Sequence, residues 1–283
     1  MNGVTRCALG NFNRHMQRLL DTLNGRRRLL QEVLAVGISG RAALAAGAPA
    51  DGAESVTVRL GSDRVRLSVQ RFGHGGLRYL NLHENEQTSV QAAKAVLARS
   101  PGTLIELHGQ GRRLLSFREG PQRLAFDPNR IFTEAGSEMT LRHWGSFNRA
   151  GLSAARQLRQ AVLSLLEGRP DEPLIALHNN AGSNFSVDVY RPGGVRAADV
   201  QALHVQPGQP PDAFFLVTRM PLYVALREAR FNVVLQNDHP VDDGSLSVWA
   251  QREKRAYVNV EARFGALREQ QAMLEAVTAL AQR

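Results

Sequence analysis

The sequence predicts an α/β domain in which strands alternate with helices and build a mixed sheet. After about residue 55, short runs of alternating apolar and polar residues, typical of half-buried strands, are interleaved with longer segments of helical periodicity. The chain also has 283 residues, 43% of them hydrophobic, which is enough to bury a substantial core. No internal repeat or low-complexity segment is visible after residue 55. These observations favour a layered domain over a repeat or fibrous protein.

The first predicted elements form a hairpin. Val56, Val58 and Leu60 alternate with polar residues, a turn-forming Gly-Ser-Asp segment follows at 61–63, and a second alternation begins at Val65. The remaining strands are expected at 77–82, 103–108, 113–118, 173–178, 185–190, 213–218, 231–236 and 256–261, and the helices at 89–98, 151–167, 220–229 and 266–282.

Residues 1–54 differ from the rest and are assigned to a leader, and residues 55–283 to one folded domain. Three consecutive arginines at 26–28 precede a run of small and apolar residues, which is typical of a secretory signal. Glu32 and Arg41 interrupt that run, so a poorly ordered extension explains the segment equally well. An export signal predicts a periplasmic or secreted protein, and an extension predicts a cytoplasmic one.

Charge and composition exclude several function classes. The formal net charge is +9, but residues 1–50 contain seven arginines against Asp21 and Glu32, a net of +5, which leaves +4 for the other 233 residues. This distribution removes the main support for a nucleic-acid partner. Cys7 is the single cysteine, which excludes a disulfide framework and a cysteine-based structural zinc site. No apolar run approaches the length of a membrane span.

Three residues suggest a metal site. His83 and Glu86 are three residues apart where a strand leads into a helix, a spacing that places an imidazole and a carboxylate around one ion. His178 stands at the end of an apolar strand, where open α/β sheets carry their chemistry. Either histidine signal taken alone would favour a structural residue over a ligand. Asn179 and Asn180 either orient this ligand or form a plain turn.

Two further residues suggest a substrate site. Arg130 has apolar neighbours in segment 126–132, and a partly buried arginine needs an anionic partner. Glu261 lies among apolar residues of a late strand, which is an unusual place for a carboxylate. Internal ion pairs, of Arg130 with Asp127 and of Glu261 with Arg263, are the structural alternatives.

Taken in order, these motifs resemble the zinc carboxypeptidase family, the carboxypeptidase A-type metallopeptidases or funnelins. The resemblance covers roughly residues 77–265 and includes the His-x-x-Glu pair, the strand ending in histidine and the late strand with glutamate. Its most specific element is DPNRIF at 127–132, and GSLSVW at 244–249 resembles the family's Gly-Ser-x-x-x-Trp-like stretch. The resemblance implies a carboxypeptidase-like catalytic domain over residues 55–283, with a mixed, mostly parallel sheet flanked by helices.

The resemblance also implies roles for individual residues. One Zn²⁺ ion would be the cofactor, and Glu261 would be the general base for water attack. The substrate would be a peptide with a free carboxylate. If the leader is an export signal, that substrate would be a peptidoglycan-derived peptide. The implied zinc ligands are His83, Glu86 and His178, the implied carboxylate-binding residues are Asn129 and Arg130, and the residue implied to polarise the carbonyl is Arg112, with Arg113 and Arg118 as competitors.

The sequence departs from the family pattern at two places. Glu84 and Asn85 fill the gap where the family usually has an arginine, and no tyrosine stands near the Gly-Ser stretch, where His239 is the only proton donor in reach. Two alternatives therefore stay open. One is a zinc deacylase of the aspartoacylase kind, which acts on acyl-amino acids and also uses an Asn-Arg pair for a carboxylate. The other is a non-catalytic binding module with the same fold.

Overall fold

The structure is a computed structural model that describes residues 54–181 and 185–281. Residues 1–53 of the predicted leader, Cys7 included, lie outside the described residues, and Glu54 is the first residue of β1. The strands are β1 (Glu54–Leu60), β2 (Asp63–Phe72), β3 (Leu77–Asn81), β4 (Gly102–His108), β5 (Leu115–Glu119), β6 (Gln122–Phe126), β7 (Leu174–Asn180), β8 (Val200–His204), β9 (Phe214–Val217), β10 (Asn232–Gln236) and β11 (Tyr257–Arg263). The helices are α2 (Gln87–Leu97), α3 (Glu134–Trp144), α4 (Arg149–Leu165), α5 (Met220–Glu228), α6 (Leu246–Arg252) and α7 (Leu267–Ala281), with short 3-10 helices η1 (Pro128–Arg130), η2 (Val187–Tyr190) and η3 (Ala197–Asp199).

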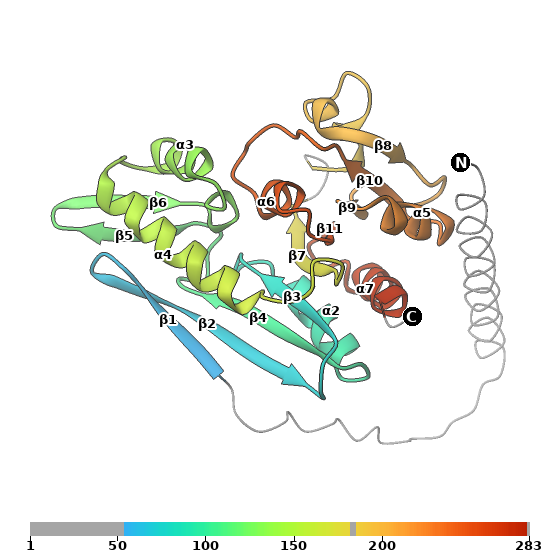
Figure 1. The fold of residues 1–283 in the computed structure, drawn as a ribbon, viewed down its shortest axis with the longest axis horizontal. Coiled ribbons are helices and arrows are strands. Elements are labelled where there is room, and N and C mark those ends of the chain that lie inside the picture. The colour runs from blue at the N-terminus through green and yellow to red at the C-terminus, as the bar shows by residue number, and fades with distance from the viewer. Residues whose placement is uncertain (1–53, 182–184, 282–283) are drawn as a thin grey trace, which may run out of the picture. The chain divides into compact units, whose positions relative to one another are not determined.

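Nine strands form one mixed sheet in the order β1-β2-β4-β3-β7-β11-β9-β10-β8, and β5 and β6 form a separate hairpin. The central strands β4, β3, β7 and β11 are parallel to one another. At one edge β2 is antiparallel to β4 and to β1, and at the other β9 and β10 are parallel to each other, while β9 is antiparallel to the central strand β11 and β10 to the edge strand β8. Figure 1 shows the helices packed along this sheet, so the predicted α/β fold with a mixed sheet is confirmed.

The core has two layers because side chains alternate along each central strand. Tyr79 and Ile175 face the layer that contains α2, α5 and α7. Their neighbours Leu80 and Ala176 face the other layer, which contains α4, α6 and the β5-β6 hairpin. All seven residues of β7 are buried, as expected for the middle strand of a parallel sheet that is covered on both faces. The site is therefore built on the most enclosed part of the fold.

The strand predicted at 185–190 is wrong. Phe185, Val187 and Val189 alternate in the sequence like a strand, but residues 187–190 form the 3-10 helix η2. The Ser186 side chain accepts a hydrogen bond from the amide of Asp188 and starts this helix. Val187 and Tyr190, three residues apart, are the buried residues of the turn. Local capping therefore overrides the alternation.

Parallel strands bring their carboxyl ends to one edge of the sheet, and this edge carries polar residues that the sequence predicts as site residues. His83 follows β3, His178 lies near the end of β7, and Glu261 lies near the end of β11. The β7–β11 register pairs Glu261 directly with His178. In the described part of the chain, none of the helices has the length and apolar character needed to cross a membrane.

Candidate metal centre

The structure brings together the three residues that the sequence predicts as metal ligands. His83 comes two residues after β3, Glu86 directly precedes α2, and His178 belongs to β7. One ligand atom from each lies within 4.8 Å of the other two, and all three residues are buried. Two imidazoles and one carboxylate are the donor set of a catalytic zinc site, in which the fourth position stays open. The group is therefore compatible with a metal ion.

Asp127 orients the His83 ring by binding the ring nitrogen that points away from Glu86. Its Nε2 lies 2.8 Å from Asp127 Oδ1, and because the pKa of Asp127 is held below its usual range, Nε2 donates to an ionised carboxylate. Its Nδ1 is buried, lies 3.0 Å from Glu86 Oε1, and makes no hydrogen bond among the described residues. A buried nitrogen without such a partner is costly unless another group uses its lone pair. The arrangement fits a ligand Nδ1 with Asp127 fixing the ring.

The charge balance of this group favours a cation. Burial lowers the pKa of His83, but the carboxylates of Glu86 and Asp127 outweigh burial and raise that pKa to about 9. Burial likewise opposes ionisation of Glu86, yet His83 and His178 hold its pKa well below its usual range. Burial lowers the pKa of His178, so this ring tends to be neutral. The two carboxylates thus give the group a negative potential that would also stabilise a bound cation, which would have to replace the proton on the His83 imidazole.

Backbone and amide contacts fix Glu86 at the start of α2. Its Oε2 accepts from the amide of Asn179 at 3.1 Å and lies 3.0 Å from His178 Nδ1. The side-chain oxygen of Asn179 in turn accepts from the amide of Ser89 in the first turn of α2. Asn179 and Asn180 thus continue strand β7 instead of forming a turn, and Asn179 orients a predicted ligand.

Arg113, rather than Arg112, reaches the metal-ligand group. Arg113 Nη1 donates to Glu86 Oε1 at 2.7 Å, and its Nε donates to Asp127 Oδ2 at 3.2 Å. Arg112, to which the sequence assigned the carbonyl-polarising role, lines a separate surface hollow together with Asp63. Adjacent side chains of an irregular segment point in different directions, so only one of the two arginines contacts the group. Spacing along the chain could not distinguish them.

Glu261 lies on the neighbouring strand β11 and lines one cavity together with Glu86 and His178. Burial, followed by the negative charge of Glu86, raises its pKa to about 8. Its partners in the described chain are amides: Asn259 Nδ2 donates to it at 3.4 Å, and Asn180 also contributes. The predicted alternative, an ion pair with Arg263, does not form, because Arg263 binds Asp212. A buried carboxylate with a raised pKa beside a candidate metal site is suited to proton transfer.

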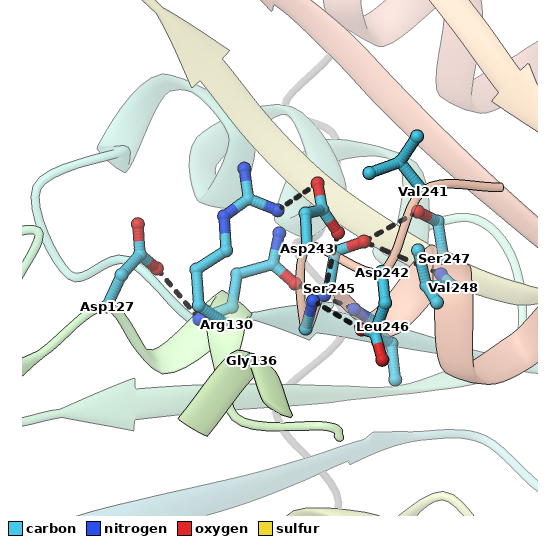
Figure 2. A network of polar contacts seen from close by, with 12 residues as sticks. Asp127, Arg130, Gly136, Val241, Asp242, Asp243, Ser245, Leu246, Ser247 and Val248 are labelled. Atoms are coloured by element: carbon cyan, nitrogen blue, oxygen red, sulfur yellow. Dashed lines mark hydrogen bonds and ion pairs between the residues drawn. The ribbon is translucent and has the colours of Figure 1, made fainter. Parts of the chain in front are cut away.

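The Asn129-Arg130 turn lines the same cavity as Glu261. Asp127 starts this turn, since its Oδ1 accepts from the amide of Asn129 at 2.8 Å. The Arg130 guanidinium is directed away from Asp127 and donates from Nη1 to Asp243 Oδ2 at 2.8 Å, as Figure 2 shows. The internal pair of Arg130 with Asp127 is therefore not observed. Arg130 is instead joined to the loop that precedes α6.

That loop, residues 241–245, and the first turn of α6 are bound to the turn at several points (Figure 2). Asn129 Oδ1 accepts from the amide of Leu246 at 3.1 Å, and the carbonyl of Gly244 accepts from the amide of Phe132 at 2.9 Å. Ser245 caps α6, as expected for a turn before a helix. Gly244 has a φ of +75°, and a Cβ there would come within 2.3 Å of the Arg130 carbonyl oxygen. Glycine is required at this position for both conformation and space.

We expect the variant Gly244→Ala to lose at least about 2 kcal/mol of unfolding free energy, because strain from positive φ adds to the backbone clash. Gly208→Ala is the matched control, since Gly208 has a φ of +79° but nothing within 4 Å of the added Cβ. This control should lose about 1 kcal/mol from φ strain alone. Urea unfolding of both variants measures the difference, and equal losses would refute the close contact.

The predicted site residues, except Arg112 and the fully enclosed His83, line one cavity of about 410 Å³. Its walls also contain Arg113, which the sequence offered as a competitor of Arg112, and four residues that the sequence did not indicate, namely Tyr190, Arg196, Asp243 and Tyr257. His239, which the sequence offered as a proton donor, is exposed and is not part of this wall. The two tyrosines supply the phenolic groups that the sequence near the Gly-Ser stretch lacks. Tyr257 lies on β11 four residues before Glu261, and Tyr190 lies in η2, but neither is part of a pattern that marks it as a cavity residue.

Comparison with known proteins adds little to this geometry. No model of a protein family matches the sequence, and neither does any curated protein. Among solved structures, a candidate metallopeptidase from Shewanella amazonensis SB2B is 16% identical, with a TM-score of 0.38 over 81% of this chain and 88% of that one. A candidate metallopeptidase from Shewanella baltica OS155 is 11% identical, with a TM-score of 0.41 over 80% and 85%. Function therefore has to be argued from the residues of the site.

Proposed function

We propose that the protein is a metal-dependent hydrolase of carboxypeptidase type that removes the C-terminal residue of a short peptide. The observation that carries this proposal is the pairing of Glu261 with His178 on adjacent strands, beside the buried His83 and Glu86 and on the same cavity as Arg130. It combines a metal-ligand set, a candidate base and a carboxylate-binding arginine in one place. These are the three components that hydrolysis at a chain end needs.

His83, Glu86 and His178 would hold the ion, and their chemistry suits Zn²⁺. When bound, such an ion acts as a Lewis acid and lowers the pKa of water. Asp127 and Arg113 hold the ligands in place by bonding His83 and Glu86 from the outer side. Partners of this kind fix the orientation of ligands and raise metal affinity.

Glu261 would act as the general base. It would accept a proton from the attacking water and return it to the nitrogen of the leaving amino acid. Its pKa of about 8, raised by burial, makes it a stronger proton acceptor than an ordinary glutamate, with the ionised form that acts as base predominating above about pH 8. The amide of Asn259 keeps the carboxylate in place without neutralising it.

Asn129 and Arg130 would bind the terminal carboxylate of the substrate. Arg130 uses Nη1 for Asp243, and its Nε and Nη2 make no hydrogen bond in the portion of the chain described. A guanidinium offers parallel donors that match both oxygens of a carboxylate. Arg113 would stabilise the negative charge that develops on the scissile carbonyl oxygen.

We expect Arg113→Gln to lower kcat by about 100-fold, because removing one donor to a developing oxyanion typically costs that much. Arg112→Gln is the matched control, since Arg112 is the adjacent arginine but lies outside the cavity. Steady-state kinetics with both variants and a measurement of bound zinc test this role. If the two variants lose activity equally, the assignment of Arg113 fails.

The proposed function is tested with purified, zinc-loaded protein and a panel of substrates. Benzoyl-glycyl peptides with a free C-terminus should be cleaved, and the same peptides with an amidated C-terminus should be cleaved at least about 100-fold more slowly, because the contact with Arg130 is lost. Equal cleavage of the amidated peptides would overturn the carboxypeptidase assignment. The deacylase alternative predicts instead that N-acetyl amino acids are hydrolysed and benzoyl-glycyl peptides are not.

A further inference from the structure

Arg196 is a partly buried arginine in the cavity wall that none of the proposed catalytic steps uses. It lies between η2 and η3, and 26% of its side chain is exposed. Its Nε lies 2.8 Å from Asp199 Oδ2, and its Nη2 donates to Asp243 Oδ2 at 2.9 Å. Two aspartates thus hold one guanidinium in a fixed orientation on the wall that Arg130 and Glu261 also line.

Asp243 joins Arg196 to Arg130. The Oδ2 atom of Asp243 accepts from both guanidinium groups, and its Oδ1 accepts from the amide of Ser245 at 3.0 Å. Both oxygens are therefore engaged, and the aspartate serves to orient the two arginines instead of receiving a ligand. Because both arginines bond one oxygen atom, their donating nitrogens are separated by no more than the sum of two hydrogen-bond lengths.

The two arginines keep donors for a ligand. Nη1 of Arg196, and Nε and Nη2 of Arg130, have no acceptor within the described ranges of the chain. A substrate that covers these groups without offering acceptors would leave buried donors unsatisfied, which is costly. A cationic ligand group would be repelled by the two guanidinium groups, because both oxygens of Asp243, the carboxylate that they share, are already engaged. The chemistry that remains is a ligand with two anionic acceptor groups.

We propose that Arg196 binds a second carboxylate, so that the preferred leaving residue is a dicarboxylic amino acid of the aspartate or glutamate type. This inference rests on the proposed function and names its substrate class. The α-carboxylate would bind Arg130 and the side-chain carboxylate would bind Arg196. Two carbon atoms separate the carboxyl groups of aspartate, and three separate those of glutamate. This spacing is comparable to the distance between the guanidinium groups of the two arginines that share Asp243.

The test compares isosteric substrates that differ in one charge. Zinc-loaded protein is assayed with benzoyl-glycyl-glutamate and benzoyl-glycyl-glutamine, and with N-acetyl-glutamate and N-acetyl-glutamine. We expect kcat/KM for the glutamate substrate to exceed that for the glutamine substrate by about 100-fold. In Arg196→Gln this ratio should fall to near 1, mainly through a higher KM for the glutamate substrate. Arg191→Gln, an exposed arginine nearby that pairs with Asp188, should keep the wild-type ratio.

A binding measurement separates this inference from the proposed function. In the variant Glu261→Gln, calorimetry should show N-acetyl-glutamate binding about 100-fold more tightly than N-acetyl-glutamine, and adding Arg196→Gln should remove the difference. If no substrate is hydrolysed but this binding preference exists, the proposed function fails and the role of Arg196 stands. If hydrolysis occurs without a preference for glutamate, or if Arg196→Gln weakens both ligands equally, the role of Arg196 is refuted.

Discussion

Replacing Glu261 with glutamine is expected to reduce kcat by about 1,000-fold, within the range by which general bases accelerate such steps. Glutamine has the same shape and can keep a contact with the amide of Asn259, but it cannot accept a proton. Zinc should stay bound, because Glu261 is not one of the three clustered ligands. Kinetics and metal analysis on the same preparation measure both quantities.

The fold of this variant should be intact, since burial disfavours the charged form of Glu261 and an amide removes that cost. Its unfolding free energy is therefore expected to equal or exceed that of the wild type. Glu253→Gln, which changes an exposed carboxylate at the end of α6, serves as the control and should keep full activity. Normal turnover in Glu261→Gln would exclude Glu261 as the base.

Replacing His83 with alanine is expected to abolish stoichiometric zinc binding and, with it, activity. Two of the three ligands remain, which is too few for a catalytic zinc site. The substitution should also cost about 3 kcal/mol of unfolding free energy, because it leaves the buried carboxylate of Asp127 without its main partner. Equilibrium dialysis with zinc and urea unfolding measure the two effects.

His239→Ala is the matched control for this variant, since His239 is exposed and lies outside the cavity. It should bind zinc and turn over substrate like the wild type. Treatment of the wild type with a chelator should reproduce the loss of activity in His83→Ala, and added zinc should restore activity in the wild type alone. Full zinc content in His83→Ala would contradict the proposed ligand set.

The three clustered ligands and Glu261 could be predicted because each lies in or next to a core strand of the parallel sheet. There the chain direction and the hydrophobic pattern place a residue at a known edge of the sheet. His178 and Glu261 are adjacent in the structure for this reason alone. The α/β class followed from the same alternation of strands and helices.

Residues in irregular segments could not be placed in this way. Arg112 and Arg113 are equivalent in spacing, and only the path of the chain after β4 determines which one contacts Glu86. Tyr190 comes from the segment 185–190 that the sequence predicts as a strand, and Arg196 lies beyond it, just before η3. The pairing of Asp243 with two arginines depends on contacts that are distant in sequence.

The direct pairing of β7 with β11 has a consequence for how the protein can change. The spacing between His178 and Glu261 is set by main-chain hydrogen bonds in the middle of the sheet, whereas Arg196 and Asp243 are carried by connecting segments. Substitutions in those segments can therefore alter what the cavity accepts without moving Glu261, the proposed base, relative to His178. The proposed chemistry and the substrate preference thus depend on different parts of the chain. New substrate preferences are best engineered in residues 185–199 and 241–248.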